Sequence, residues 1–386
     1  MPAPAVPPAP LPAPLPAPLP APPSPAPSPA SEPAASPANP APPPLRGAYV
    51  FDRTLAAADP DGRARLLDGL AATGLTTLIT KADAATPALS AACHAAGLRL
   101  VGSVACLSDH AEPAERRRPD LRPVSGDGRP WQQREWYTGL VPTDPVHGER
   151  LAERCAGAAA GGLLDGLVLD FLRWPLHWEQ ELRPGARPRD ASYDPTTLAD
   201  FTRRTGIPVP ADPVAARTVL TGRHREHWFR YRREVVTGLA RTLVAAARHA
   251  RPGLWTGLFL VPEEDGARRT RLVGQSAAEL APLVDALLPM SYHAILHRPP
   301  EWVGAVARAV RAEAGGSPGT AVVPMVQTTS SAALARGADW GPPVTTAGFR
   351  AALHHALDAS AGGDLCLFPG EGLDGPGRRA LTDALA

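Results

Sequence analysis

The sequence has few cysteines and little net charge. Only four of its 386 residues are cysteines, and they are widely spaced without a Cys-x-x-Cys pattern. This spacing favours buried free thiols, which suit a reducing compartment. The formal charge is +1, so electrostatic attraction to nucleic acid is not expected.

The sequence also lacks long apolar runs. We find no stretch of about 18 apolar residues free of proline and charge, so no membrane span is expected. As the chain is given, the residues after Met1 include neither a basic segment nor an uninterrupted apolar segment, and no signal peptide is expected. We therefore expect a cytoplasmic protein, or a secreted or surface-attached one if the true start site lies upstream.

Composition divides the chain at about residue 45. Residues 1–45 are almost entirely Pro, Ala, Leu and Ser, with no aromatic residue and only one charged side chain, Glu32. Such a tract has few backbone donors and few bulky apolar groups, which predicts a disordered or polyproline arm. The arm is interpreted as a spacer, or as a tether on a surface or secreted protein. Residues 46–386 form the predicted folded domain.

Short apolar runs alternate with alanine-rich helical stretches from residue 46 onward, a pattern typical of repeated βα units. The pattern predicts eight strands, at residues 47–52, 76–81, 99–106, 166–172, 255–261, 286–292, 321–327 and 364–368. Predicted helices include residues 62–72, 87–96, 148–159, 224–249, 277–284, 301–314, 346–359 and 376–385. The expected fold class is therefore α/β, a (β/α)8 TIM barrel.

The fourth predicted strand carries the most informative segment, residues 165–175 (DGLVLDFLRWP). A buried apolar run ends in Asp170, Arg173 and Trp174, and active sites of such barrels lie at the C-terminal ends of the strands. An ion pair that only closes the strand end is the structural alternative.

The connections after the third and fourth strands are long, at residues 107–147 and 173–224, and leave the same face of the barrel. As a set, their aromatic residues suit stacking on sugar rings, although packing remains the more common role for each one. These residues are Trp131, Trp136, Tyr137, Trp174, Trp178 and Tyr193.

Several motifs occur together in a fixed order. They are residues 127–136 (DGRPWQQREW) with 142–145 (PTDP), residues 165–175, residues 193–206, residues 228–232, residues 274–275 and residues 285–293 (DALLPMSYH). In these motifs the chain resembles the glycosyl-hydrolase-like TIM-barrel family, which is distantly akin to the α-amylase clan. The resemblance covers nearly all of residues 46–370 and implies a glycosidase acting on a polysaccharide or glycoconjugate, without a cofactor or metal.

The implied reaction needs one protonated and one ionised carboxyl group beside the scissile bond. Asp170 lies where amylase-like enzymes carry their nucleophile, but Val168 replaces the arginine that those enzymes have two residues earlier. Glu263 and Glu264 follow the fifth strand and are the candidates for the general acid. A solvated loop or helix N-terminus is the structural alternative for these two residues.

Polar residues at other strand ends are candidates for substrate binding, because the ends of parallel strands meet at one mouth. We expect Arg173 and Trp174 to contribute from the fourth strand. The remaining candidates are Asp52, Tyr292, His293 and Gln327, with Lys81, Asp83 and Glu371 as further polar residues at strand ends.

Other functions have weaker support. His224 and His227 lack the His-Glu-x-x-His spacing of a metal hydrolase, and residues 369–372 (PGEG) are too acidic for a phosphate loop. The main alternative is a non-catalytic carbohydrate-binding or scaffold barrel, which would bind glycans without releasing reducing ends.

Overall fold

The computed structural model of the protein describes residues 44–315, 317, 319–360 and 363–386. Apart from Pro44 and Leu45, the predicted Pro-rich arm lies outside the described residues. Leu45 is buried, and its backbone N–H donates to Asp364 Oδ1 at 2.7 Å. Leu45 thus belongs to the folded part of the chain. Every helix in the described part is too short or too polar to cross a bilayer.

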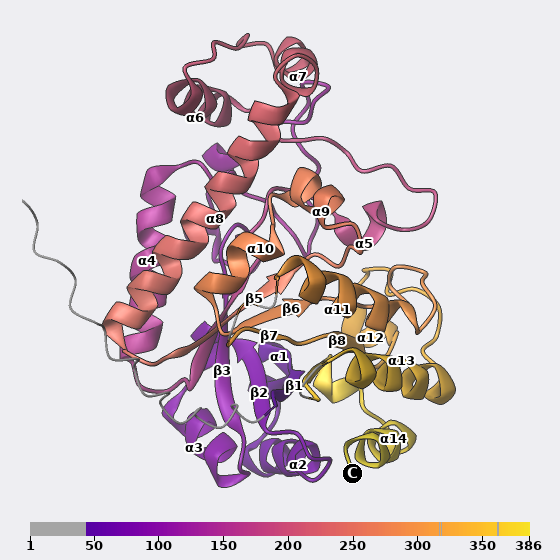
Figure 1. The fold of residues 1–386 in the computed structure, drawn as a ribbon. Helices are drawn as coiled ribbons and strands as arrows, with labels where there is room; N and C mark the ends of the chain where they lie inside the picture. The colour runs from indigo at the N-terminus through magenta and orange to yellow at the C-terminus, as the bar shows by residue number, and fades with distance from the viewer. Residues whose placement is uncertain (1–43, 316, 318, 361–362) are drawn as a thin grey trace, which may run out of the picture. The chain divides into compact units, whose positions relative to one another are not determined.

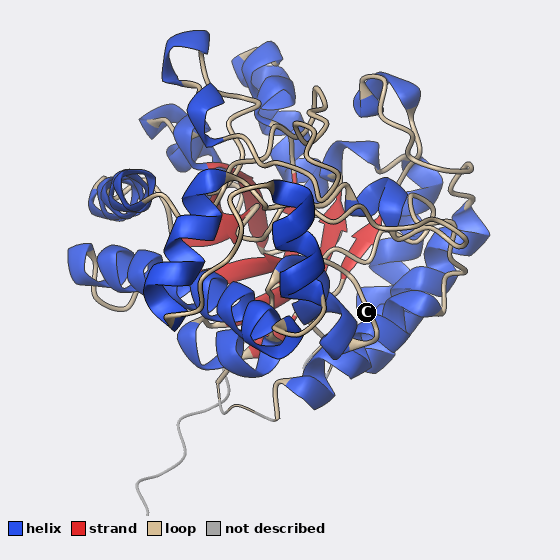
Figure 2. Ribbon diagram, turned by 90° about the horizontal axis from the view of Figure 1, so that it is seen from above, coloured by secondary structure: helices blue, strands red, loops and turns tan. Residues whose placement is uncertain are grey.

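The strands form one parallel sheet in the order β7-β6-β5-β4-β3-β2-β1-β9-β8. Figure 2 shows these strands at the centre of the molecule with helices around them. The strands are β1 Arg46–Tyr49, β2 Thr77–Lys81, β3 Arg99–Ala105, β4 Gly166–Asp170, β5 Trp255–Leu260, β6 Ala286–Pro289, β7 Ala321–Val322, β8 Met325–Gln327 and β9 Leu365–Phe368.

The short strands β7 and β8 together fill one barrel position. Strand β7 pairs with β6, and β8 pairs with β9. Between them, the Val323 N–H donates to Leu287 O at 2.9 Å, and the carbonyl of Pro324 accepts from Cys366 N at 3.0 Å. Proline has no N–H to donate, which explains why the regular ladder is interrupted here. The sheet closes, and the predicted TIM-barrel fold is confirmed.

The outer layer is helical. Its helices are α1 Asp52–Ala57, α2 Pro60–Ala71, α3 Pro87–Ala95, α4 Pro145–Ala160, α5 Trp178–Glu181, α6 Pro195–Thr205, α7 Pro213–Thr221, α8 Arg225–Ala250, α9 Gly266–Val273, α10 Ala277–Leu280, α11 Trp302–Glu313, α12 Ala332–Ala335, α13 Thr346–Ala359 and α14 Gly375–Leu385. Helices α4 and α8 lie side by side, and α6 and α7 gather at one end of α8 (Figure 1).

The core fixes the strand that carries Asp170. Leu167, Val168 and Leu169 of β4 are at most 3% exposed. Burial of each such side chain contributes about 1.5–3 kcal/mol, which holds the position and register of β4. The four cysteines are buried and unbonded, as their spacing predicted.

Three predicted strands end two or three residues earlier than expected. Strand β1 ends at Tyr49, so Asp52 is the first residue of α1; β6 ends at Pro289, so Tyr292 and His293 lie in the following loop. Strand β4 ends at Asp170, because Phe171 has a left-handed backbone with φ of 52°. Asp52 is therefore in a helix and Tyr292 and His293 are in a loop, whereas Asp170 is the last residue of the β4 ladder.

Candidate active site

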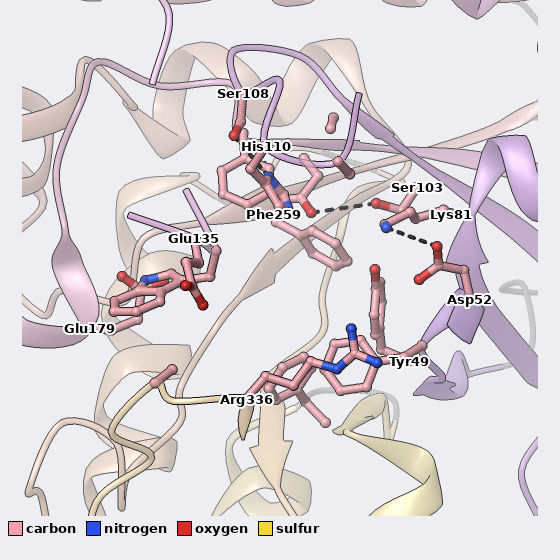
Figure 3. A pocket seen from close by; sticks show the side chains of 18 of the residues that line it. Tyr49, Asp52, Lys81, Ser103, Ser108, His110, Glu135, Glu179, Phe259 and Arg336 are labelled. Atoms are coloured by element: carbon pink, nitrogen blue, oxygen red, sulfur yellow. Dashed lines mark hydrogen bonds and ion pairs between the residues drawn. The ribbon is translucent and has the colours of Figure 1, made fainter. Parts of the chain in front are cut away.

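A cavity of about 760 Å³ lies at the C-terminal ends of the strands. Its size is in the range of sites for small molecules. Residues of β1 to β5 and β9, and of the segments that follow β1 to β4, β6 and β8, line it, including Tyr49, Asp52, Lys81, Ser103, His110 and Glu179 (Figure 3). The polar residues and the tyrosine predicted at strand ends that line the cavity are Asp52, Lys81, Asp83, Asp170, Arg173 and Tyr292.

Asp170 lies in the cavity wall at the end of β4. Its Oδ1 accepts from the N–H of Phe171 at 2.7 Å, and its Oδ2 lies 3.5 Å from the Ser103 hydroxyl. Burial raises the pKa of Asp170 to about 6, although the charge of Arg173 and these hydrogen bonds oppose the increase. Asp170 therefore titrates near neutral pH.

Glu179 is a second carboxyl group of the cavity, and the sequence analysis did not identify it. Burial raises its pKa to about 7, with the charge of Arg173 opposing and the charge of Asp170 contributing to the increase. Its Oε2 is buried without a hydrogen-bond partner among the described residues. A carboxyl group with so little stabilisation of its charge retains its proton more readily than Asp170 does.

Buried neighbours hold Glu179 in place, although α5 has only four residues. Before it, the His177 ring stacks on Trp131, with 4.0 Å between ring centroids. Trp178 is 1% exposed and packs against Tyr292 at 5.7 Å. The long loop after β3, which contributes Trp131, therefore supports the segment that follows β4.

Arg173 lies close to both carboxyl groups. The residue is 1% exposed, and its Nε and Nη2 atoms are buried without a hydrogen-bond partner among the described residues. The guanidinium lies 4.6 Å from the ring centroid of Tyr137 and 4.9 Å from that of Phe171. Because a buried charge without a partner is costly, the two rings and the fields of Asp170 and Glu179 are what stabilise this cation.

On the opposite side of the cavity, Lys81 Nζ lies 2.9 Å from Asp52 Oδ2 (Figure 3). His110 Nδ1 lies 3.0 Å from the hydroxyl of Ser108. Burial lowers the pKa of His110 to about 4, with a further contribution from the charge of Lys81, so the imidazole is neutral at physiological pH. These residues present hydrogen-bonding groups toward the cavity.

Aromatic side chains form one wall of the cavity, here called the aromatic wall: Tyr49, Phe51, Tyr292, Trp340 and Phe368. Tyr292 stacks on Phe368 at 4.3 Å, and Phe51 stacks on Trp340 at 6.2 Å. Phe51, Trp340 and Phe368 are half-buried, so part of their surface is available to a ligand. Aromatic faces of this kind bind the apolar faces of sugar rings.

The predicted acids Glu263 and Glu264 do not line the cavity. Glu263 forms an ion pair with Arg268, and Glu264 is exposed to solvent. Asp265 accepts from the N–H of Arg268 at 3.0 Å and caps α9. The acidic run therefore matches the helix N-terminus that the sequence analysis gave as the alternative.

Three predicted binding residues are likewise outside the cavity lining. Trp174 is fully buried, and its Nε1 donates to Arg232 O at 2.8 Å. Gln327 is fully buried and bridges two loops, accepting from Ile295 N at 3.0 Å and donating to Trp340 O at 3.1 Å. His293 is 5% exposed, and burial lowers its pKa to about 4.

The aromatic residues of the two long connections divide in the same way. Trp136 and Trp178 line the cavity, whereas Trp131, Tyr137 and Tyr193 are buried behind it. In the described part of the chain, no group of three or more His, Cys, Asp or Glu side chains is arranged to hold a metal ion.

No family model and no curated protein matches the chain. Among solved structures, the PgaB glycoside hydrolase domain of Bordetella bronchiseptica is similar at a TM-score of 0.62 and 16% identity, over 89% of this chain and 99% of that one. The β-amylase catalytic domain of Paenibacillus polymyxa is similar at 0.60 and 12%, also over 89% and 99%.

The chain has the fold of glycoside-hydrolase barrels. A β-galactosidase of Halorubrum lacusprofundi is also similar, with a TM-score of 0.62 and 14% identity, over 88% of this chain and 57% of that one. At these identities the likeness concerns the fold. It agrees with the barrel family that the sequence motifs resemble.

Proposed function

We propose that the protein is a glycoside hydrolase that cleaves a polysaccharide or glycoconjugate, with Glu179 as proton donor and Asp170 as the ionised carboxylate. The observation that carries this proposal is the pair of carboxyl groups in one cavity at the barrel mouth, with pKa values raised to about 7 and about 6. Paired carboxyl groups with separated pKa values divide acid and base roles in this reaction.

The surroundings of the two groups support these roles. Glu179 Oε2 has no donor among the described residues to stabilise its charge, which favours the protonated form that a general acid needs. Asp170 accepts hydrogen bonds from Phe171 N and Ser103, which favour the carboxylate. Proton transfer from Glu179 to the glycosidic oxygen would leave positive charge on the sugar, and the carboxylate of Asp170 would stabilise it.

The aromatic wall would bind the sugar ring in this proposal, and Asp52 with Lys81 would hydrogen-bond its hydroxyl groups. Arg173 would lower the pKa of both carboxyl groups, and the hydrogen bonds from Phe171 N and Ser103 would keep Asp170 the more acidic of the two. Glu179 replaces Glu263 and Glu264 as the candidate acid, since only Glu179 lines the cavity.

The test is release of reducing ends from a panel of polysaccharides by the full chain and by Asp170→Asn. We expect the substitution to lower turnover at least about a hundredfold, because one preorganised electrostatic group contributes about 3–4 kcal/mol to transition-state stabilisation. Asp358→Asn, an exposed change on α13, is the matched control and should leave turnover unchanged.

Two outcomes would contradict the proposal. Wild-type turnover in the Asp170→Asn protein would remove Asp170 from the reaction. Binding of glycans without release of reducing ends by the unmodified chain would favour the non-catalytic carbohydrate-binding barrel.

A further inference from the structure

Most charged side chains around the cavity are already paired. Lys81 pairs with Asp52 at 2.9 Å, and Arg154 pairs with Asp83. These pairs leave little net charge on the side of the cavity formed by β2 and β3. The side beside the aromatic wall differs, because it carries two guanidinium groups that form no ion pair within the described residues.

The first is Arg53, which is half-buried and lines the cavity. Its guanidinium carbon lies 3.9 Å from the ring centroid of Phe51, and its Nη2 donates to the carbonyl of Leu334 at 2.6 Å. The charges of Glu371 and Asp52 raise the pKa of Arg53, but within the described residues neither pairs with it: Glu371 accepts from Thr54 Oγ1 at 2.7 Å, and Asp52 pairs with Lys81. Arg53 is thus held in position by an aromatic ring and a neutral carbonyl.

The second is Arg336, which follows α12 and also lines the cavity. Its side chain makes no hydrogen bond or ion pair within the described residues, and in Figure 3 it extends into the cavity toward Tyr49. Its backbone is left-handed, with φ of 46° and ψ of 54°. Residues other than glycine adopt this conformation at a cost of about 1 kcal/mol or more, and here the conformation accompanies a side chain that enters the cavity.

The two cations line the same cavity, and Arg53 Nη2 donates to the carbonyl of Leu334, two residues before Arg336. The pKa of Arg53 is lowered, first by burial and next by the positive charge of Arg336. Like charges held together in a cavity repel, and an anion placed between them would relieve that repulsion. Guanidinium groups also match the planar oxygens of carboxylate and sulfate groups.

We propose that Arg53 and Arg336 bind an anionic substituent of the substrate, so that the glycan is an acidic one bearing a uronate carboxylate or a sulfate. The inference rests on the proposed glycosidase function for the sugar itself. The aromatic wall takes the ring, and the two guanidinium groups beside Phe51 and Tyr49 take its negative group. Asp170 and Glu179 then face the glycosidic bond.

The test compares probes that differ only in charge. Two matched pairs are used: trigalacturonate against its methyl ester, and a κ-carrageenan tetrasaccharide, which carries sulfates but no uronates, against its neutral desulfated form. Binding to the full chain is measured by calorimetry at two ionic strengths. We expect the acidic member of at least one pair to bind about tenfold more tightly or better, since a hydrogen bond to a charged group contributes that much.

Substitutions test whether Arg53 and Arg336 are the residues that produce the preference for acidic probes. Arg336→Gln and Arg53→Gln should each reduce the acidic preference about fivefold or more, and Arg336→Lys should restore part of it because the charge remains. Arg350→Gln, an exposed change on α13, is the control for nonspecific attraction of polyanions and should keep the wild-type preference. A preference for the uronate pair alone identifies a carboxylate, and a preference for the sulfated pair alone identifies a sulfate.

Several results would overturn this inference. They are equal binding of charged and neutral members, an unchanged preference in both Gln variants, and absence of binding to either acidic probe at millimolar concentration. Cleavage of neutral glycans together with any of these results would leave the glycosidase proposal standing. Tight binding of an acidic probe without cleavage of any glycan would instead refute the glycosidase proposal and retain the anion site.

Discussion

Replacing Glu179 by Gln should separate catalysis from stability. The substitution keeps the shape of the side chain and removes its ionisable group. If Glu179 donates the proton to the leaving group, turnover should fall about a hundredfold or more, because a positioned general acid contributes about 10²–10⁴ to the rate. The same change should make the folded protein more stable at alkaline pH, because the carboxylate there is a buried charge with little compensation.

The pKa of Glu179 sets the size of the stability gain. Burial raises this pKa from 4.5 to about 7. The contribution of the protonated Glu179 to the free energy of unfolding is fully present below the unfolded-state pKa. It is lost as pH rises through the folded-state pKa. Each unit of pKa corresponds to about 1.36 kcal/mol. The free energy of unfolding is therefore lowered by about 3 kcal/mol at pH 8 and by about 1 kcal/mol at pH 5, relative to the fully protonated group. Because the residue is partly open to the cavity, we expect a gain of about 1–3 kcal/mol for the Gln variant at pH 8.

Urea unfolding at both pH values, with turnover measured on the same samples, tests this reasoning. The Gln variant should unfold at higher urea concentration than the unmodified chain at pH 8, with the difference much reduced at pH 5. Glu135→Gln is the control, because Glu135 also lines the cavity but is exposed, and it should give no such gain. A Glu179→Gln protein that is less stable at pH 8 would show that the carboxylate has a structural partner.

The remaining predictions concern pH, packing and the arm. With pKa values of about 6 for Asp170 and about 7 for Glu179, turnover should peak near pH 6.5 and fall about sevenfold at pH 5 and pH 8; a flat profile would contradict the pair. Trp174→Ala should cost about 3–5 kcal/mol in the free energy of unfolding, measured with urea, because the ring is fully buried. A Trp174→Ala variant that is as stable as the unmodified chain but loses sugar binding would show that Trp174 binds the substrate. Deleting residues 1–43 should leave the free energy of unfolding unchanged within about 0.5 kcal/mol, because their composition supplies no core; a cooperative loss of structure on truncation would refute this.

The barrel was predictable because its signal is repeated. Each apolar run is short, but eight of them alternate with helical stretches, and closure of the parallel sheet follows from the count. The structure adds the break in the seventh position, where Pro324 interrupts the ladder between β7 and β8. The proline was visible in the sequence, and its missing N–H gives the break a direct cause.

Helices α6 and α7 each begin at a recognisable N-terminal sequence pattern. Asp194 and Asp212 each precede a proline, and their carboxylates accept from Thr197 N and Ala215 N at 2.8 Å. Aspartate at the N-cap followed by proline at the first helical position is a frequent helix start. The same pattern at Asp144 places the start of α4 at Pro145 rather than at the predicted residue 148.

The positions of the two carboxyl groups of the proposed pair are not equally predictable from the sequence. Asp170 follows a buried strand, so its place at the barrel mouth follows from the fold. Glu179 lies on a single helical turn, which is too short for a hydrophobic period to detect. Its position depends on the stacking of His177 on Trp131, a residue 46 positions earlier in the chain, and no local pattern reports such a contact.

Glu263 and Glu264 show the opposite case, in which residues near a strand end turn away from the mouth. The acidic run follows β5, but Asp265 caps α9 and Arg268 binds Glu263. The acidic run had two interpretations, a catalytic group at the barrel mouth and a helix N-terminus. The local hydrogen bonds of the helix determine the direction of these side chains. Proximity to a strand end therefore predicts a location, whereas the element that follows decides the orientation.

Backbone strain provides an indication of the site that the sequence alone lacks. Within the described residues, four non-glycine residues have positive φ, and two of them, Phe171 and Arg336, line the cavity. Phe171 follows Asp170 and donates its N–H to that carboxylate, while Arg336 directs its guanidinium into the cavity. Neither residue type favours a left-handed backbone, so the surrounding fold must hold each one there. Two of the four strained positions thus lie next to the proposed catalytic carboxylate and in the proposed anion site, and strain of this kind is frequent at functional sites.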